Sequence, residues 1–407
     1  MTANQHVSTI TGPLNGLRVL DLSRILAGPT CTQLLGDMGA DVIKIEKPAG
    51  GDDTRAWGPP FVKDQDDNFT TESAYYLCAN RNKRSIAVDI TTTEGAAFIR
   101  RLLTTCDVLV ENFKVGGLKK YGLAYDDLKA EFPELIYCSI TGFGQTGPNA
   151  HRPGYDLLAQ GFGGIMSLTG EANGEPMKVG VGICDVMTGM YANSAVLAAL
   201  YHQKTNGGGQ QIDVALVDVQ TAWLVNEGTN YLLSGDEPLR RGNGHPNIVP
   251  YQVFSVEDGH VIVAVGNDQQ FKRFCHILQH PELADDPLYT TNQLRLKHRE
   301  QLIPILSKIL SSQKKQQLIT LMEQEAIPGG PINTLSQLFA TEQVRAREMK
   351  ISMPYPESKT GTVELIGNPI KFSATPVSYH LAPPKCGQHS QEIIDELDRL
   401  TATDQPQ

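Results

Sequence analysis

The amino-acid sequence predicts an α/β protein in which a large domain with a parallel, Rossmann-like sheet is joined to a smaller α+β domain. Three observations lead to this fold class. Short apolar segments alternate with helical patterns along the first half of the chain, which is typical of a parallel sheet covered on both faces. A β-hairpin pattern follows a polar, glycine-containing loop. The length of 407 residues also exceeds one hydrophobic core of ordinary size.

The large domain is predicted from its alternation of apolar strands and amphipathic helices. A polar excursion rich in glycine and proline interrupts this alternation at residues 48–71. The expected strands are 17–22, 41–46, 85–90, 107–111, 135–141 and 211–216. The expected helices are 28–38, 94–104, 187–202 and 217–233, with a final amphipathic helix at 388–400.

The small domain is predicted from a hairpin, 251–256 and 260–265, whose strands are separated by Glu257-Asp258-Gly259. Helical patterns at 268–280, 295–311 and 314–324 complete it, and a Pro-Gly-Gly-Pro breaker follows at 328–331. The expected boundaries are 14–205 for the first part of the large domain, 206–224 for a linker, 225–327 for the small domain and 328–407 for a linker and the return.

Composition excludes several classes of protein. A net charge of −10 argues against general nucleic-acid binding. No apolar run approaches the roughly 18 residues that span a bilayer, and residues 1–13 lack the regions of a signal peptide, so we expect a cytoplasmic protein without membrane association. Seven scattered cysteines without a C-x-x-C pair are expected to be reduced thiols, and we expect no metal site.

Several catalytic motifs are absent from the sequence. No G-x-G-x-x-G follows the first strand, and there is no Walker A loop, H-E-x-x-H or G-x-S-x-G. These absences weigh against a dinucleotide-dependent oxidoreductase, a P-loop NTPase, a zinc protease and a serine hydrolase.

Candidate binding groups follow the predicted strands. Residues 24–27 follow the first strand, Lys47 the second, 112–114 the fourth and 142–155 the fifth. Because ligands of parallel sheets bind beyond the carboxyl ends of the strands, these groups are expected to share a cleft for a phosphate-bearing ligand.

Asp185 lies where a glycine-containing segment leads into a long helix of small residues. One interpretation is a helix N-cap, for which aspartate is a favoured residue. The other is a carboxylate nucleophile that attacks an activated acyl group near the helix N-terminus. Position alone leaves both interpretations open.

Several ordered motifs resemble those of the class III CoA-transferases, from about residue 14 to 395. The motifs are 20–29, 39–48, 82–86, 110–113, 154–156 and Asp185-x-x-Thr188-Gly189. Within this family, segments 51–62, 137–142, 248–252 and 266–271 resemble the members that move CoA between succinyl-CoA and a C5-type dicarboxylate such as glutarate or 3-hydroxy-3-methylglutarate. Residues 241–246 depart from the glycine-rich lid of formyl-CoA transferase, so its specificity does not transfer directly.

The resemblance implies that Asp185 is the nucleophile. In family chemistry the carboxylate forms a mixed anhydride with the acyl group and then a thioester with CoA, and the acceptor acid reverses the sequence. The resemblance implies no permanently bound cofactor, with a CoA thioester and a carboxylic acid as substrates. It also implies a homodimer of interlocked rings.

The resemblance also implies roles for individual residues. By motif position, the CoA contacts are Leu26, Ala27, Lys47, Val88, Asn112, Phe113, Lys114 and Lys120. Tyr75, Tyr155 and Asp156 match positions that line the acyl site. A dicarboxylate needs a partner for its distal carboxylate, and we expect Arg81 in this role, with Arg24 and Arg55 as the next candidates.

Three alternatives remain at this point. The first is a CoA-transferase for another acid, such as itaconate, mesaconate, malate or oxalate. The second is an α-methylacyl-CoA racemase, which would need a general acid and base such as Asp156 with His151. The third is a CoA-binding module without catalysis.

Overall fold

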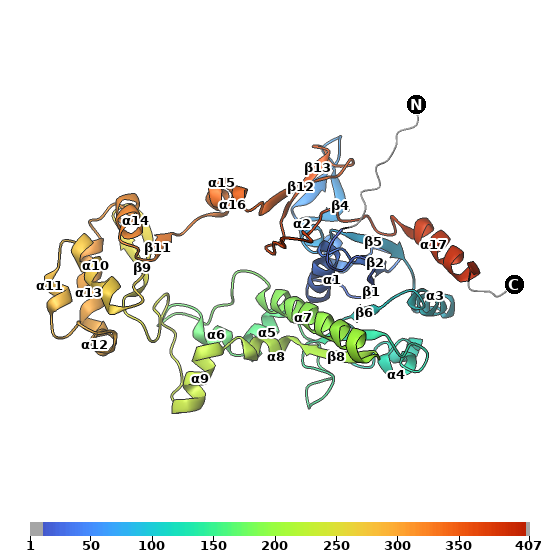
Figure 1. The fold of residues 1–407 in the computed structure, drawn as a ribbon, viewed down its shortest axis with the longest axis horizontal. Helices are drawn as coiled ribbons and strands as arrows, with labels where there is room; N and C mark the ends of the chain where they lie inside the picture. Colours follow the sequence, from blue (N-terminus) through green and yellow to red (C-terminus); the bar gives the residue numbers. More distant parts are fainter. Residues whose placement is uncertain (1–10, 404–407) are drawn as a thin grey trace. The chain divides into compact units, whose positions relative to one another are not determined.

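The computed structural model describes residues 11–403, with side chains described up to residue 400. The chain forms two compact units (Figure 1). The large unit comprises the residues up to 165, 178–235 and those from 343 onward, and the small unit comprises 166–177 and 236–342. The structure thus groups residues 225–235 with the large unit, whereas the sequence predicts the small domain from residue 225.

The large unit is built on a six-stranded, fully parallel sheet of order β5-β2-β1-β6-β7-β8, which confirms the predicted fold class. The order reverses direction at β1, and Leu20 of β1 pairs with Ile43 of β2 and Leu109 of β6. The strands are β1 (Arg18–Asp21), β2 (Asp41–Glu46), β5 (Lys83–Ala87), β6 (Val108–Glu111), β7 (Ile136–Thr141) and β8 (Gln210–Ala215).

Both faces of this sheet are covered by helices, because successive strand residues point to opposite sides. Val19 contributes to the core beneath α1 (Ala27–Asp37) and α7 (Ile183–Asn206). Its neighbour Leu20 contributes to the core beneath α3 (Thr93–Leu103) and α17 (Ser390–Thr403). Figure 1 shows α1 and α7 side by side, and they pack along their lengths.

Several predicted helices have different limits in the structure, and two in the large unit differ most. Helix α7 begins at Ile183, four residues before the predicted start at 187. The predicted helix 217–233 is two helices, α8 (Leu216–Ala222) and α9 (Val225–Ser234). The break coincides with Val225, a β-branched residue held at φ +38°, which is outside the helical region.

The remaining elements of the large unit are short and lie mostly between the strands. The excursion at 48–71 forms a 3₁₀ turn and most of a two-stranded hairpin. The remaining elements of the large unit are η1 (Asp53–Ala56), β3 (Phe61–Lys63), β4 (Phe69–Ser73), α2 (Ala74–Leu77), η2 (Lys119–Tyr121), α4 (Tyr125–Leu128), α5 (Asp156–Phe162), β12 (Lys350–Pro354) and β13 (Thr362–Ile366).

The small unit has its own hydrophobic core between a three-stranded antiparallel sheet, of order β11-β10-β9, and a set of helices. The predicted hairpin is confirmed as β9 (Tyr251–Val256) and β10 (Gly259–Ala264), and β11 (Gly329–Pro331) adds the third strand. The helices are α10 (Asp268–Ile277), α11 (Glu282–Asp285), α12 (Asn292–Lys297), α13 (Arg299–Leu310), α14 (Lys315–Gln324) and α15 (Leu335–Ala340). Helices α6 (Ile165–Leu168) and α16 (Glu342–Ala346) lie at the boundaries of the units.

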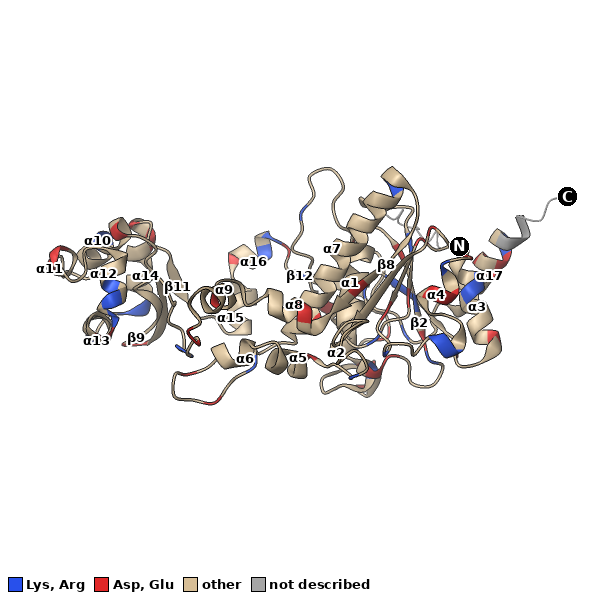
Figure 2. Cartoon of the chain, turned by 90° about the horizontal axis from the view of Figure 1, so that it is seen from below, with Lys and Arg blue, Asp and Glu red and all other residues tan. Residues whose placement is uncertain are grey.

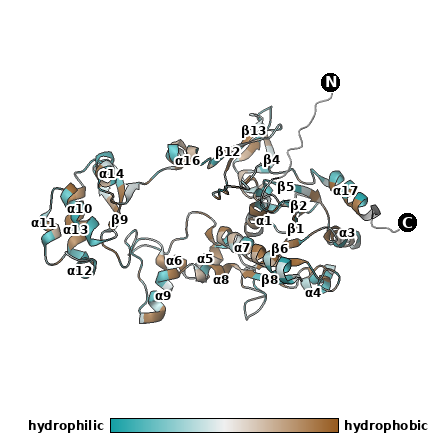
Figure 3. Ribbon diagram, in the orientation of Figure 1, coloured by the Kyte–Doolittle hydropathy of each residue, from teal (hydrophilic) through white to brown (hydrophobic). Residues whose placement is uncertain are grey.

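Helix α7 is long and apolar enough, by length and composition, to pass a test for membrane spans. In Figure 2 its ribbon is almost entirely tan, with few positions coloured as charged residues, and Figure 3 shows mostly pale and hydrophobic colours along it. Half of the most apolar stretch of α7 is buried within the protein, and the helix packs against α1 and the sheet. We therefore interpret α7 as a core helix, which is consistent with a soluble protein.

Candidate active site

Asp185 lies in the first turn of α7 but does not cap the helix. The N-cap residue is Gly182, which has no side chain that could accept hydrogen bonds from the free backbone N–H groups of the first turn. The carboxylate of Asp156 accepts them instead, with Oδ1 at 2.7 Å from the Cys184 nitrogen and 3.2 Å from the Asp185 nitrogen. Asp156 therefore caps α7 from another helix, and the Asp185 carboxylate is left available for chemistry.

The capping carboxylate is itself held by a chain of hydrogen bonds. The other oxygen of Asp156 accepts from Nε2 of Gln160 at 2.6 Å. The amide oxygen of Gln160 accepts from the Val179 backbone nitrogen at 2.8 Å. The segment that leads into Asp185 is thus fixed by the first turn of α5.

The Asp185 side chain is largely removed from water, with an exposed fraction of 8%, and this loss of solvation disfavours its charged form. Burial, with the charge of Asp156 as the second cause, raises the pKa of Asp185 to about 7. Burial, followed by the charges of Asp185, Cys78 and Asp156, raises the pKa of Tyr75 to about 12. A carboxylate with little solvation is a stronger nucleophile than one in water, and perturbed pKa values of this kind cluster at functional sites.

Close contact between α1 and α7 depends on Gly189, one turn after Asp185. A Cβ atom at this position would lie 2.6 Å from the Ala27 carbonyl oxygen and 2.7 Å from Cβ of Thr30. The absence of a side chain lets the backbone of α7 approach α1, which places Asp185 beside the loop after β1.

A groove leads from the end of β2 to Asp185. One part, of about 270 Å³, is lined by Lys47, Val88 and Phe113 among others. The next part, of about 130 Å³, is lined by Phe113, Lys114 and Asp185. Arg24 and Phe113 line both parts, so the groove is continuous, and we call it the CoA groove.

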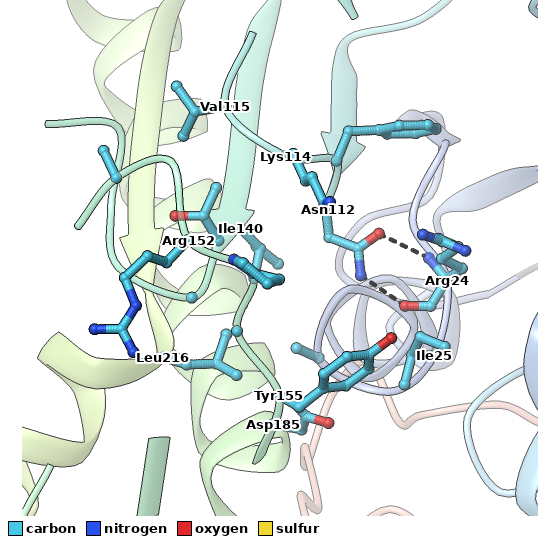
Figure 4. Close-up of a pocket in the computed structure, with 17 residues that line it drawn as sticks. Arg24, Ile25, Asn112, Lys114, Val115, Ile140, Arg152, Tyr155, Asp185 and Leu216 are labelled. Atoms are coloured by element: carbon cyan, nitrogen blue, oxygen red, sulfur yellow. Dashed lines mark hydrogen bonds between the residues drawn. The ribbon is translucent and has the colours of Figure 1, made fainter. Parts of the chain in front are cut away.

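Asn112 lines the CoA groove and also holds the loop after β1. Its amide oxygen accepts from the Arg24 backbone nitrogen at 3.0 Å, and its amide nitrogen donates to the Arg24 carbonyl oxygen at 2.7 Å (Figure 4). These bonds hold the loop in which Ile25, a β-branched residue, has φ +73°. Asn112 lines the groove, but its amide is engaged in shaping the loop.

Other expected CoA contacts are divided between the groove and its surroundings. Ala27 lines the CoA groove, whereas Leu26 lines the neighbouring cavity described below. Lys120 does not line either part of the groove, and its ammonium lies over the Tyr121 ring at 4.7 Å from the centroid. The contact of Lys120 with CoA therefore stays a prediction.

A second, larger cavity of about 970 Å³ also reaches Asp185, and we call it the acid cavity. Its lining is largely apolar, and it brings together Tyr75, Tyr155 and Asp156, as the resemblance implies. Trp57 packs edge-on against Tyr75 with ring centroids 5.1 Å apart. Tyr155 lines both the cavity and the groove, and Figure 4 shows its ring beside Asp185.

Two of the three candidate arginines do not lie in the acid cavity. Arg24 lines the CoA groove and pairs with Asp53. Arg55 is buried in a bidentate pair with Glu46, at 2.6 and 2.8 Å. Both guanidinium groups are held by carboxylates of the folded chain, and neither lines the acid cavity.

Arg81 does line the acid cavity. Its guanidinium donates to both carboxylate oxygens of Asp37, at 2.9 and 2.6 Å, and to the Ile366 carbonyl oxygen at 2.8 Å. A guanidinium has five N–H donors, so one donor on each terminal nitrogen is left after these bonds.

Several residues of the site were missed by sequence reasoning. Arg152 lines the CoA groove, stacked over the Phe143 ring at 4.9 Å. Lys178 and Asn193 line the acid cavity. Lys178 stands in the same short segment as Asp185, and Asn193 lies eight residues beyond Asp185 on its helix, so helical spacing was the available signal.

Groups needed for alternative chemistries are not assembled here. His151 is exposed and lines neither the groove nor the acid cavity, so it is not placed to form an acid–base pair with Asp156. No group of residues suited to a metal ion occurs in the part of the chain that the structure describes. The seven cysteines are unpaired.

Residues 14–390 match CoA-transferase family III. The chain is 50% identical to succinate–glutarate CoA-transferase of Agrobacterium fabrum, over 97% of this chain and 98% of the relative. It is 44% identical to human succinyl-CoA:glutarate CoA-transferase, over 95% and 86%, and 37% identical to succinyl-CoA:mesaconate CoA-transferase of Haloarcula hispanica, over 96% and 98%.

A solved structure shares the same architecture. The crystal structure of a CAIB/BAIF family protein from Brucella suis superimposes with a TM-score of 0.84 at 47% identity, covering 95% of this chain and 100% of that one. The chain therefore belongs to CoA-transferase family III, and it is an enzyme of the CoA-transferase class. Enzymes of this class act on CoA thioesters.

Proposed function

We propose that this protein transfers CoA from succinyl-CoA to glutarate or a similar C5 dicarboxylate, with Asp185 as the covalent nucleophile. The observation that carries the proposal is that Asp185 lines both the CoA groove and the acid cavity. A group that must react with a CoA thioester from one side and with a free acid from the other needs such a position. Relatives named for succinate and glutarate support the choice of acids.

The reaction proceeds in two balanced halves. The Asp185 carboxylate attacks the carbonyl of succinyl-CoA, the C–S bond breaks, and CoA leaves as a thiolate from a mixed anhydride. The thiolate then attacks the aspartyl carbonyl, which releases succinate and leaves CoA attached to Asp185 as a thioester. Glutarate repeats these steps in reverse, so glutaryl-CoA forms and the carboxylate of Asp185 is restored.

The lining of the acid cavity suits these intermediates. Anhydrides and thioesters hydrolyse if water reaches them, and the apolar lining, which includes Trp57, Tyr75 and Tyr155, offers water few hydrogen-bond partners. The remaining donors of Arg81 support its proposed role in binding the distal carboxylate of the acid. Arg81→Lys keeps the charge but loses the fork, so we expect a higher KM for glutarate; an unchanged KM would remove this assignment.

Mass spectrometry after incubation with succinyl-CoA and glutarate tests the proposal. A transferase forms glutaryl-CoA and free succinate, and the Asp185→Asn variant forms neither. A screen of itaconate, mesaconate, malate and oxalate as acceptors distinguishes the other acids. A racemase gives neither product, and a binding module retains CoA unchanged, so either of those outcomes rejects the proposal.

We further propose that the enzyme works as a homodimer whose chains interlock. The described large unit exposes apolar side chains along α7 and α9, among them Tyr201 at 72% and Leu233 at 83% exposure. Exposed apolar surface of this extent marks an interface. Light scattering of the purified protein is expected to give the mass of two chains, and a monomer that retains full activity would contradict the proposal.

A further inference from the structure

The two parts of the CoA groove face different ends of the substrate. Of these parts, Asp185 lines only the smaller one, so the thioester of a bound CoA lies there. The other end of CoA carries a diphosphate and a 3′-phosphate. These phosphates are therefore expected in or beside the larger part, lined by Lys47 and Val88, and we call this part the nucleotide end of the groove.

Both half-exposed cations at the nucleotide end pair with the same carboxylate. Three positively charged side chains occur among the described residues that line this end, and one of them, Lys44, is buried against Asp52 at 2.9 Å. The other two, Arg24 and Lys47, are 53% and 56% exposed, and both pair with Asp53, Lys47 at 2.7 Å. The cations that a phosphate could reach are thus already held by an anion of the chain itself.

The Asp53 carboxylate is ionised at neutral pH. Loss of solvation alone would raise its pKa, but the hydrogen bond from Lys47 and the charge of Arg24 bring the pKa below its ordinary value. One carboxylate between two cations leaves this group of three side chains with a single net positive charge. A CoA molecule with several negative charges therefore meets a weaker attraction than the two cations alone would give.

The backbone that carries Asp53 is fixed beside the groove, whereas its side chain can move. The preceding carboxylate, that of Asp52, accepts from the Thr54 backbone nitrogen at 3.0 Å, and the Asp52 backbone nitrogen donates to Glu46 at 2.8 Å. The Asp53 side chain is 28% exposed, and rotation about its two side-chain bonds can turn the carboxylate toward water. A phosphate could therefore take its place without rearranging the loop.

Asp53 opposes phosphate binding in either of two arrangements. If the phosphate replaces the carboxylate, both ion pairs with Asp53 must break. If the carboxylate stays, the phosphate must bind the remaining donors of Arg24 and Lys47, close to a like charge that repels it. Ordering of the two cations by Asp53 would act in the opposite sense, but exposed ion pairs contribute little.

We infer that Asp53 is an internal competitor of the CoA phosphates, which holds Arg24 and Lys47 in the free enzyme and limits how tightly the nucleotide end binds CoA. A CoA-transferase releases a CoA thioester in every cycle, and a carboxylate that returns to the two cations favours this release. The inference deepens the proposed function and rests on its CoA groove. It does not depend on the identity of the acids or on Asp185 as the nucleophile.

Calorimetric titration of the whole enzyme tests the inference by comparing Asp53→Asn with the wild type. The ligands are CoA and adenosine 3′,5′-bisphosphate, which is the phosphate-bearing nucleotide without the pantetheine arm. Asparagine has nearly the shape of aspartate but no charge. The fitted number of sites corrects for any misfolded fraction, and the KM for glutarate serves as a readout that involves no phosphate.

The expected result is a gain of affinity, which a merely structural role of Asp53 would not produce. Each exposed ion pair changes an equilibrium constant by up to about fivefold. With both pairs removed, Asp53→Asn should lower the Kd of CoA and of the bisphosphate by about 3- to 20-fold, while the KM for glutarate stays the same. The gain should shrink at high salt, because exposed charges are screened.

A matched control comes from Asp67, a second exposed carboxylate with two cationic partners. It pairs with Lys63 at 3.1 Å and with Lys359 at 3.0 Å, and it lines neither part of the groove. Asp67→Asn removes the same charge and should leave both Kd values unchanged. An equal gain of affinity in the two variants would overturn the inference, because it would reflect net charge alone.

The outcomes separate this inference from the proposed function. An unchanged or higher Kd of CoA in Asp53→Asn overturns the inference, because the carboxylate would then order the two cations for the phosphate and not compete with it. A wild-type enzyme that binds CoA but forms no glutaryl-CoA rejects the proposed function, and the Kd comparison still decides the inference. A wild type that binds neither ligand rejects the CoA groove and the inference together.

Discussion

Replacing Asp185 with asparagine is expected to abolish activity and to make the protein more stable at neutral pH. The pKa of Asp185 is raised from the model-peptide value of 3.8 to about 7, chiefly by burial. A carboxyl group whose pKa is higher in the folded state binds its proton more tightly there, so keeping it ionised at high pH destabilises the fold. Asparagine has a similar shape and never ionises.

The magnitude follows from the shift. About three pKa units at about 1.4 kcal/mol each give about 4 kcal/mol, fully present above pH 7. The sign of the linkage sets the window: the destabilisation is absent below about pH 3.8, where Asp185 is protonated in both states, and grows as the pH rises to 7. The gain from Asp185→Asn should therefore be large at pH 8 and clearly smaller at pH 5.

Denaturant unfolding of both proteins at pH 8 and pH 5, at equal protein concentration, measures this gain. A variant that is no more stable than the wild type at pH 8 would refute the buried, destabilised carboxylate. An equal gain at both pH values would show that some other effect of the substitution is responsible.

Replacing Asp156 with asparagine removes the second cause of the raised pKa of Asp185, so the acid limb of the pH–rate profile, expected near pH 7, should move to lower pH. An acid limb at the same pH in the variant would contradict this. Gly189→Val adds side-chain atoms at a position where a Cβ alone would lie 2.6 Å from the Ala27 carbonyl oxygen, so the free energy of unfolding should fall by about 1–3 kcal/mol. An unchanged free energy of unfolding, measured with denaturant, would reject the close contact between α1 and α7. Lys47→Ala should raise the KM for the CoA thioester more than the KM for glutarate in steady-state kinetics, because Lys47 lines the groove and not the acid cavity. A larger rise in the KM for glutarate would show that CoA does not bind in this groove.

Much of the sheet could be predicted from the sequence because its strands are buried on both faces. Each reads as a short apolar run, and the predicted strand 41–46 matches β2 residue for residue. The predicted hairpin also matches β9 and β10 closely, because its turn residues set the register.

The start of α7 could not be predicted, because its cap comes from a distant part of the chain. Gly182 offers no capping side chain, and Asp156, 28 residues from Cys184 in the sequence, satisfies the free N–H groups. A local rule assigns the nearest aspartate, Asp185, as the cap. The folded chain brings a second carboxylate to that position, so the Asp185 carboxylate is not needed as a cap.

The roles of several charged and polar residues could not be predicted either, because they depend on hydrogen-bond partners that the sequence does not indicate. Arg55 is nine residues from Glu46, yet nothing in the spacing indicates that the two form a buried pair. Asn112 clamps the backbone of Arg24 from 88 residues away. Asn112 lines the groove, whereas Arg55 lines neither the groove nor the acid cavity, and in both cases the hydrogen-bond partners could not be read from the sequence.

The proposed mechanism requires that Asp185 becomes acylated during turnover. Incubation with succinyl-CoA and hydroxylamine, followed by peptide mass spectrometry, detects this step, because hydroxylamine converts an activated aspartyl group to a hydroxamate. We expect a hydroxamate on Asp185 when succinyl-CoA is present and none when it is omitted. Continued turnover of succinyl-CoA and glutarate with no modification of Asp185, or with modification at another carboxylate, would contradict it.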